Sequence, residues 1–342
     1  DSASHGNDAV DSASPSTQTD GSAADATSGP DGSAADATSE PDGSAGDAGP
    51  GNDTAAPVLQ WHPGPDLPVQ LGAMGVAALG STVFLMGGAR HYHPAPDVPS
   101  RQHRSYAVAQ KPYAELAETP DDDQWGPCVV AHDGYLYSFG GWDWGDKTLR
   151  RYDPQSDTWD RMARCPGLHM WGFACALVNG VLYVISGSTG DLPTQVTDRV
   201  NAYDIASNKW SDKARFPVGA AGLTGAAIDT KIYVVGRGAI LDIYDTEAEV
   251  WTTGPSIGRN AVQAVAVAHG GSLYVFGGGA NVEEDSASVD RLDFPGPVWN
   301  SLPPLPSARN LPAAVAVGNE IHLFGGFVGG VGVDTHQYLV IP

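Results

Sequence analysis

Short apolar segments that end in small residues recur along the chain from about residue 70 onward. They read TVFLMGG, YLYSFGG, VLYVISGS, KIYVVGR, SLYVFGG and IHLFGG. Each follows an alternating segment of small apolar residues and a tight turn, as in CVVAHDG and AVAVGNE. Apolar runs of about four to eight residues, rich in β-branched and aromatic side chains and bounded by glycine, are typical of strands. The pattern therefore predicts many short strands joined by tight turns.

The glycine-containing ends return at a nearly constant interval, which predicts six repeat units. We align them as Gly87-Gly88, Gly140-Gly141, Gly187-Ser188, Gly236-Arg237, Gly277-Gly278 and Gly325-Gly326, with steps of 53, 47, 49, 41 and 48 residues between second members. A second spacing of seven residues follows in the pairs Tyr152/Trp159, Tyr203/Trp210, Tyr244/Trp251 and Leu292/Trp299, and Tyr106/Tyr113 keeps it with Tyr in the Trp place. An Asp follows the first member at Asp153, Asp204, Asp245 and Asp293.

These features recur together in register, and the sequence from about residue 58 to 342 resembles the kelch repeat. The resemblance implies a β-propeller with four strands per blade. The sixth unit ends without its Trp, whereas the segment VLQWHPGPDLP near residue 58 carries Trp61 and matches VWNSLPPLP at residue 298. We therefore predict an all-β, six-bladed kelch-type propeller in which residues 58–68 complete the last blade and close the ring.

The first 57 residues have a different composition, without Lys, Arg, Trp, Tyr, Phe, Leu or Ile, and with 11 acidic residues. Such a segment buries too little apolar surface to offset the entropy of ordering it. We predict a disordered acidic linker over residues 1–57 and a propeller over residues 58–342. The linker resembles those of bacterial envelope lipoproteins. It predicts a secreted, periplasmic or cell-surface protein, tethered through a lipidated N-terminus that this chain does not include.

The formal net charge of −22 argues against a nucleic-acid partner, which requires clustered Lys and Arg. The most apolar window, residues 261–280, alternates and contains glycines, so we expect no transmembrane segment. The partner that remains is a protein or a glycan.

Loops from the second to the third strand, and from the fourth strand to the next blade, share one face of a propeller. We call it the loop face, and we expect ligands to bind there. Arg237, Arg259 and Arg309 would lie on adjacent blades at its rim, where their guanidinium groups could hold a carboxylate. The competing interpretation is that these arginines form structural bonds to neighbouring loops.

Aromatic side chains add to the same rim. Trp142 and Trp144 follow the second glycine pair and could stack on sugar rings, and His169 lies beside Trp171. For Trp125 and Trp171, which precede inner strands, core packing is the favoured interpretation.

The loop of residues 89–103 contains His91, His93 and His103, which form a weak candidate metal site. A solvated loop is the favoured interpretation, and we expect no cofactor.

The three cysteines are an odd number. Cys128 and Cys175 each lie thirteen residues before the second member of their pair, which places them at equivalent positions of neighbouring inner strands. A disulfide needs Cα atoms within about 7 Å. Packing of small residues around the axis is the interpretation that we favour for this pair, and Cys165 is the expected free thiol.

No nucleophile elbow, phosphate loop, Cys-x-x-Cys or HExxH motif is present. The favoured function is a non-enzymatic binding module, because binding is the commonest role that the kelch resemblance implies.

The alternative is a sugar-acid mutarotase or epimerase, similar to the bacterial six-bladed kelch family that interconverts sialic-acid anomers. The three arginines could bind the carboxylate, but no matching acid–base Glu is identifiable, although Glu283 and Glu284 lie in a loop. A galactose-oxidase-like copper enzyme is less favoured, because it needs a further C-terminal domain.

Overall fold

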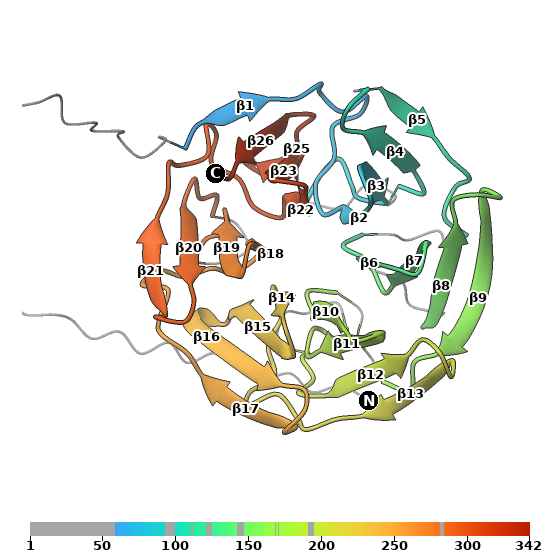
Figure 1. The fold of residues 1–342 in the computed structure, drawn as a ribbon, viewed down its shortest axis with the longest axis vertical. Coiled ribbons are helices and arrows are strands. Elements are labelled where there is room, and N and C mark those ends of the chain that lie inside the picture. The colour runs from blue at the N-terminus through green and yellow to red at the C-terminus, as the bar shows by residue number, and fades with distance from the viewer. Residues whose placement is uncertain are drawn as a thin grey trace, which may run out of the picture. The chain divides into compact units, whose positions relative to one another are not determined.

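A computed structural model describes residues 59–92, 100–110, 112–120, 125–141, 147–167, 169, 171–190, 195–280 and 284–342. The regular structure within these residues is entirely β. Six four-stranded antiparallel sheets surround a common axis (Figure 1), which confirms the prediction of a six-bladed propeller. The predicted linker over residues 1–57 lies outside the described residues.

Each blade runs from an inner strand at the axis to an outer strand at the rim (Figure 1). Blade one contains β2 (Gly75–Leu79), β3 (Thr82–Met86), β4 (His103–Ala107) and β5 (Tyr113–Glu115), and blade two contains β6 (Cys128–His132), β7 (Tyr135–Phe139), β8 (Thr148–Asp153) and β9 (Thr158–Arg164). Blade three contains β10 (Ala174–Val178), β11 (Val181–Ile185), β12 (Val200–Asp204) and β13 (Lys209–Asp212), and blade four contains β14 (Thr224–Ile228), β15 (Lys231–Gly236), β16 (Gly238–Asp245) and β17 (Val250–Thr253). Blade five contains β18 (Val265–His269), β19 (Ser272–Phe276), β20 (Val289–Asp293) and β21 (Val298–Ser301).

Blade six joins the two ends of the folded chain. Its strands are β22 (Ala313–Val317), β23 (Glu320–Phe324), β26 (His336–Val340) and, on the outside, β1 (Trp61–Pro63). Trp61 pairs with Leu339 and Pro63 with Gln337. This arrangement confirms that the N-terminal strand completes the last blade, which leaves no blade with a missing outer strand.

The recurring Trp residues connect neighbouring blades. Each indole N–H donates to a backbone carbonyl at the end of the outer strand of the preceding blade or just after it, in the pairs Trp61–Pro303, Trp159–Ala117, Trp210–Ala163, Trp251–Ala214 and Trp299–Pro255. Tyr113, which occupies the Trp position of blade one, donates its hydroxyl to the carbonyl oxygen of Pro65 at 3.0 Å. The five Trp residues and Tyr113, which recur at the seven-residue spacing or, for Trp61, in the strand that closes the ring, therefore link the six blades through hydrogen bonds.

The glycine pairs are positions of close backbone approach, and their predicted register in blades three and four was wrong by one residue. A Cβ on Gly88 would lie 2.9 Å from the Gly72 carbonyl oxygen, and one on Gly236 would lie 2.4 Å from the Gly222 carbonyl oxygen. The pair in blade three is Ser186-Gly187, because Ser186 and Gly187 both have positive φ, as Gly87 and Gly88 do. The second member must be glycine because the residues that lead into the inner strand of the same blade lie against it.

It follows that Arg237 does not replace a glycine. It occupies the next position, which Ala89, Ser188, Gly279 and Phe327 hold in other blades. In three of these blades this residue exchanges backbone hydrogen bonds with the loop that enters the inner strand, as Ala89 does with Gly72 and Phe327 with Asn310. Because other blades hold alanine, serine or phenylalanine at this position, it does not require glycine, and an arginine there is not unusual.

Candidate functional site: the loop face and the axial cavity

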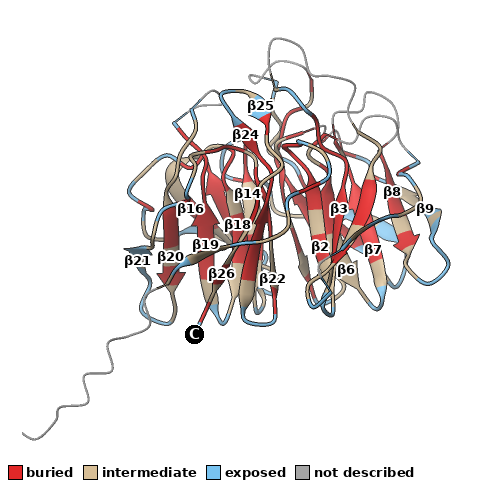
Figure 2. Cartoon of the chain, turned by 90° about the horizontal axis from the view of Figure 1, so that it is seen from above, coloured by how far each residue is buried: buried red, intermediate tan, exposed pale blue. Residues whose placement is uncertain are grey.

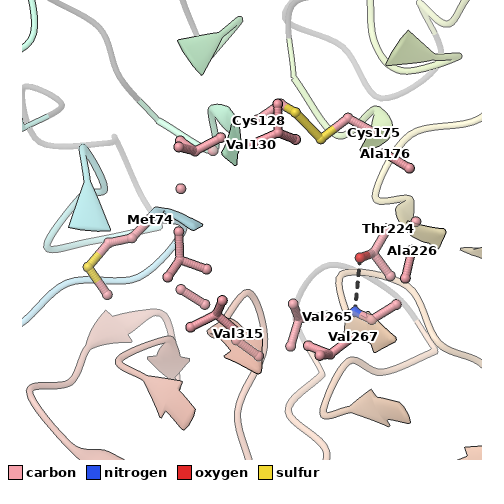
Figure 3. A pocket seen from close by; sticks show the side chains of 18 of the residues that line it. Met74, Cys128, Val130, Cys175, Ala176, Thr224, Ala226, Val265, Val267 and Val315 are labelled. Atoms are coloured by element: carbon pink, nitrogen blue, oxygen red, sulfur yellow. Dashed lines mark hydrogen bonds between the residues drawn. A yellow bond between two sulfur atoms is a disulfide. The ribbon is translucent and has the colours of Figure 1, made fainter. Parts of the chain in front are cut away.

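The inner strands β2, β6, β10, β14, β18 and β22 enclose a cavity of about 460 Å³ on the axis (Figure 3). Its walls are small apolar residues and backbone, including Gly75, Ala176 and Ala226. The hydroxyl of Thr224, one of its few polar side chains, accepts a hydrogen bond from the Ala266 amide at 3.0 Å. The small side chains leave this space on the axis open.

Aromatic residues cluster on the loop-face side of this cavity, and we call Tyr92, Trp125, Trp171 and Phe327 the aromatic plug. The ring centroid of Trp125 lies 5.6 Å from that of Tyr92 and 5.9 Å from that of Trp171. Tyr92 also contacts Phe327 at 5.7 Å and accepts a hydrogen bond from Gln263 at 2.8 Å. Core packing of Trp125 and Trp171 is thus confirmed, since both are buried.

A collar of backbone hydrogen bonds underlies the plug. Every blade places one residue with positive φ just before its inner strand: Ala73, Gly126, Gly172, Gly222, Gln263 and Leu311. The amides of Gly126, Ala73, Leu311 and Gln263 donate to the carbonyl oxygens of Ala73, Leu311, Gln263 and Gly222, at 2.8 to 3.0 Å. Three members are not glycine, and a left-handed conformation costs such residues about 1–2 kcal/mol each. The blade-to-blade bonds hold them in it.

A small hairpin rises from blade six on the loop face (Figure 2). Its strands are β24 (Phe327–Val328) and β25 (Val331–Gly332), joined by Gly329 and Gly330. Three backbone amides anchor it: Tyr92 to the Gly330 carbonyl, Gly332 to the Arg90 carbonyl, and Gly329 to the Asp285 carboxylate. Phe327 is buried, whereas Val328 and Val331 are 36% and 46% exposed. The hairpin is therefore a fixed structure with an apolar tip.

The structure gives Arg237 and Arg259 carboxylate partners within the protein. Arg237 donates two hydrogen bonds to Asp242 at 2.7 and 3.1 Å, and Arg259 donates to Asp290 at 2.6 Å. Arg309 has no exposed surface and donates to the Gly325 carbonyl and the Thr335 hydroxyl. The interpretation as structural bonds accounts for these contacts. A role for the three residues in ligand binding stays a prediction.

Asp242 and Asp290 belong to a polar belt that the sequence analysis missed. Two residues before the Tyr or Leu of the third strand, blades one to five each carry a buried polar side chain: Arg104, Arg150, Asn201, Asp242 and Asp290. In blade six the half-buried Gln337 holds this position, two residues before Leu339. Because a buried charge needs a partner, Asp242 and Asp290 require the arginines that contact them. The signal was visible in the sequence as a fixed offset from the recurring Tyr.

His169 is also fully buried. Its Nδ1 donates to the Ser186 carbonyl at 2.7 Å, and its Nε2 lies 2.7 Å from the Asn201 side-chain oxygen. Burial lowers the pKa of this imidazole. Its role as a ligand-binding residue stays a prediction, as do those of Trp142 and Trp144, which lie outside the described residues.

The three histidines proposed for a metal fall in different surroundings. His91 is exposed on the loop face, His93 lies outside the described residues, and His103 is not a loop residue but the buried first residue of β4. His103 Nδ1 donates to the Ala117 carbonyl, and burial lowers its pKa to about 4. Within the described part of the chain, no group of three His, Cys, Asp or Glu side chains is placed to hold a metal ion.

The preference for small-residue packing at Cys128 and Cys175 was wrong, because the two form a disulfide with Cα atoms 6.2 Å apart. Their assumed equivalence was wrong by one residue: Cys128 is the first residue of β6, whereas Cys175 is the second of β10. Successive residues of a strand face opposite sides. The offset therefore turns the two sulfur atoms toward each other. Cys165 is free, as predicted, and burial raises the pKa of its thiol to about 12.

Comparison with known proteins agrees with this architecture. Two family models, each described as Kelch motif, match residues 126–166 and 261–306, and residues 172–217. Kelch-like protein 35 of Mus musculus is 28% identical over 240 residues, which is 68% of this chain and 39% of that protein. Alpha-scruin of Limulus polyphemus is 26% identical over 261 residues, 68% of this chain and 28% of that protein. The chain thus spans well under half the length of these relatives.

A solved structure titled "Structure of YjhT" matches with a TM-score of 0.68 and 17% identity, over 82% of this chain and 97% of that one. This likeness concerns the fold. With six blades, recurring motifs and these relatives in agreement, the chain is a kelch-repeat β-propeller protein. None of its described residues belongs to a helix suited in length and apolarity to span a bilayer.

Proposed function

We propose that this propeller is a non-enzymatic protein-binding module that acts outside the cytoplasm and engages its partner through the loop face. The observation that carries the proposal is the β24–β25 hairpin. Its two exposed valines form a cross-strand pair on a tip that hydrogen bonds hold from both sides. A pre-ordered apolar tip loses little conformational entropy on binding, so it is suited to insert into a pocket of another protein.

The charge of the chain supports a partner with a basic surface. The formal net charge is −22, and two connections between strands are strongly acidic in sequence. Residues 118–123, between β5 and β6, contain four acidic side chains, and residues 283–285, between β19 and β20, contain three. Complementary charge mainly speeds association and selects among partners. We therefore propose a protein that presents an apolar pocket bordered by Lys and Arg.

The disulfide supports a setting outside the cytoplasm. Disulfides persist in oxidising compartments and are rare where cellular thiols keep cysteines reduced. The Cys128–Cys175 bond joins two blades within the folded ring. It is consistent with a secreted, periplasmic or cell-surface protein.

The proposal is tested by capture of extracytoplasmic proteins of the source cell on the immobilised chain. The test variant is V328S/V331S, and the matched control is V250S/V298S, which changes valines that are 48% and 64% exposed on outer strands. We expect a partner that the wild type and the control retain, that the hairpin variant loses, and that added salt releases. Partners held equally by all three proteins would contradict a role for the hairpin.

The mutarotase alternative is checked with the same protein. The rate of sialic-acid anomer exchange, followed by proton NMR, should not change when the propeller is added. Acceleration that R259A abolishes would replace the binding proposal by the enzymatic one.

A further inference from the structure

The boundary between blades two and three differs from the other blade boundaries near the axis. Among the described residues, no backbone hydrogen bond joins Gly172 of blade three to Gly126 of blade two, so the collar has a gap here. Blade four still reaches blade three through the Leu223 amide and the Gly172 carbonyl, at 2.9 Å. The inner strands β6 and β10 also share the sparsest contact of the six neighbouring pairs of inner strands.

The disulfide lies at this same boundary. Cys128 begins β6 and Cys175 lies in β10, so the bond joins the two inner strands that the collar leaves unconnected. The rim of the boundary keeps its usual contact, because the Trp210 indole donates to the Ala163 carbonyl at 3.0 Å. Among the described residues near the axis, a covalent bond therefore stands where the other boundaries have hydrogen bonds and closer strand contact.

Both cysteines line the axial cavity, where the disulfide bridges two strands across its wall (Figure 3). Cys128 is buried, whereas Cys175 keeps some exposed surface. The third cysteine, Cys165, lies in the connection that leads out of blade two and is buried. A small reductant thus has a route to the disulfide through the cavity, while Cys165 is shielded.

We propose that the Cys128–Cys175 disulfide is a redox-sensitive closure of the propeller at the boundary between blades two and three. Its reduction loosens β6 and β10 from each other near the axis while the other boundaries stay closed. Three features at this boundary support the proposal: the gap in the collar, the sparse contact between β6 and β10, and the disulfide that faces the cavity.

The chemistry of opening is thiol–disulfide exchange with a dithiol. A thiolate of the dithiol attacks one sulfur of the pair, the S–S bond breaks, and the other cysteine leaves as a thiolate that takes up a proton. The second thiol of the reductant then closes its own disulfide and releases the remaining cysteine. The protein gains two electrons and two protons, and the dithiol is oxidised to a disulfide.

Opening would also change the loop face. Trp125 and Trp171 directly precede Gly126 and Gly172, and their rings meet edge to face across this boundary. Separation of β6 from β10 therefore separates the two indoles and disturbs the aromatic plug beside the hairpin. A resulting loss of partner binding rests on the proposed function, whereas the opening itself does not.

The test is hydrogen exchange with mass spectrometry on the folded full chain, before and after treatment with dithiothreitol. Alkylation and mass measurement report how much of the disulfide is reduced. We expect at least tenfold faster amide exchange in residues 125–139 and 171–185 after reduction, and unchanged exchange in residues 224–236 of blade four. The Tm should fall by roughly 5–10 °C, as expected for a lost disulfide in a domain of this size.

Two variants sharpen the result. C165S should respond to dithiothreitol as the wild type does, whereas C128A/C175A should exchange rapidly with or without it. If that double variant does not fold, reduction of the native protein still decides the question. A disulfide that dithiothreitol cannot reduce in the folded chain, or unchanged exchange after full reduction, would overturn the proposal. Neither readout needs a partner, so this failure is distinct from failure of the binding proposal.

Discussion

The indole N–H of Trp61 donates to the carbonyl oxygen of Pro303 at 3.2 Å, and these residues are 242 positions apart in the chain. The bond has the same form as those that the other four Trp residues make between neighbouring blades. It differs in that Trp61 belongs to the N-terminal strand β1, which forms the outer strand of blade six. Closure of the ring thus uses the interblade bond that the repeat supplies everywhere else.

The first prediction concerns this bond. Trp61→Phe keeps an aromatic ring but removes the donor, so the unfolding free energy should fall by about 1–2 kcal/mol. Urea unfolding at constant temperature measures the change. Trp299→Phe removes the equivalent bond to the Pro255 carbonyl inside the ring and should cost a similar amount. If Trp61→Phe keeps the wild-type unfolding free energy while Trp299→Phe loses stability, closure of the ring does not depend on the Trp61–Pro303 hydrogen bond.

The second prediction concerns Tyr113, whose hydroxyl is the interblade hydrogen-bond donor of blade one, where the other blades use an indole N–H. Tyr113→Phe removes the hydroxyl that donates to the Pro65 carbonyl and lies 3.4 Å from His336 Nδ1, and it should destabilise the fold by about 1 kcal/mol. Tyr338→Phe, on β26 of the neighbouring blade, is a suitable control, since no hydrogen bond of its hydroxyl is found within the described residues. Equal midpoints for the two variants in thermal unfolding would show that the interblade hydrogen bond of Tyr113 does not stabilise the fold.

Acid should destabilise the propeller through His103. Burial lowers the pKa of this imidazole to about 4, whereas the unfolded chain has the ordinary value of 6.5. The unfolded state therefore binds the proton more tightly, and stability falls as pH drops from about 6.5 to 4. The difference corresponds to about 3 kcal/mol.

His103→Phe tests this expectation. The ring keeps its edge-to-face contact with Tyr152 but cannot titrate, so the loss of unfolding free energy between pH 7 and pH 4.5 should shrink by about 2–3 kcal/mol. Denaturant unfolding at a series of pH values gives both curves. Parallel curves for variant and wild type would show that His103 is not the group responsible.

The fourth prediction separates structural from ligand-binding arginines. Arg237→Ala leaves the buried Asp242 carboxylate without its partner, which should cost about 3 kcal/mol of stability. Adding Asp242→Asn removes the stranded charge and should recover part of the loss. Unfolding midpoints of the single and double variants measure this coupling. An Arg237→Ala protein as stable as the wild type would instead favour an arginine kept for a ligand.

The repeat made the architecture predictable from the sequence. Glycine positions such as Gly88, and the seven-residue spacing to Trp159, follow from backbone contact and aromatic packing that every blade shares. Even the closure by Trp61 could be inferred, because the last unit lacked a Trp that the first segment supplied.

Features specific to one blade were harder to predict. The register at Ser186-Gly187 was misplaced, because a serine at positive φ looks like ordinary strand sequence. The same one-residue uncertainty hid the disulfide, since a shift of one turns Cys175 to the opposite side of its strand. The β24–β25 hairpin depends on contacts with Arg90, Tyr92 and Asp285 from distant loops, and no local pattern reports them.

The most direct test of the binding proposal is the Kd of the captured partner, measured by calorimetry for three forms of the full chain. We predict that V328S/V331S binds at least tenfold more weakly than the wild type, while V250S/V298S binds equally well. The hairpin variant should keep the wild-type Tm, because both valines are partly exposed at the tip. Equal Kd values for all three proteins would contradict the claim that the loop face binds its partner through the hairpin.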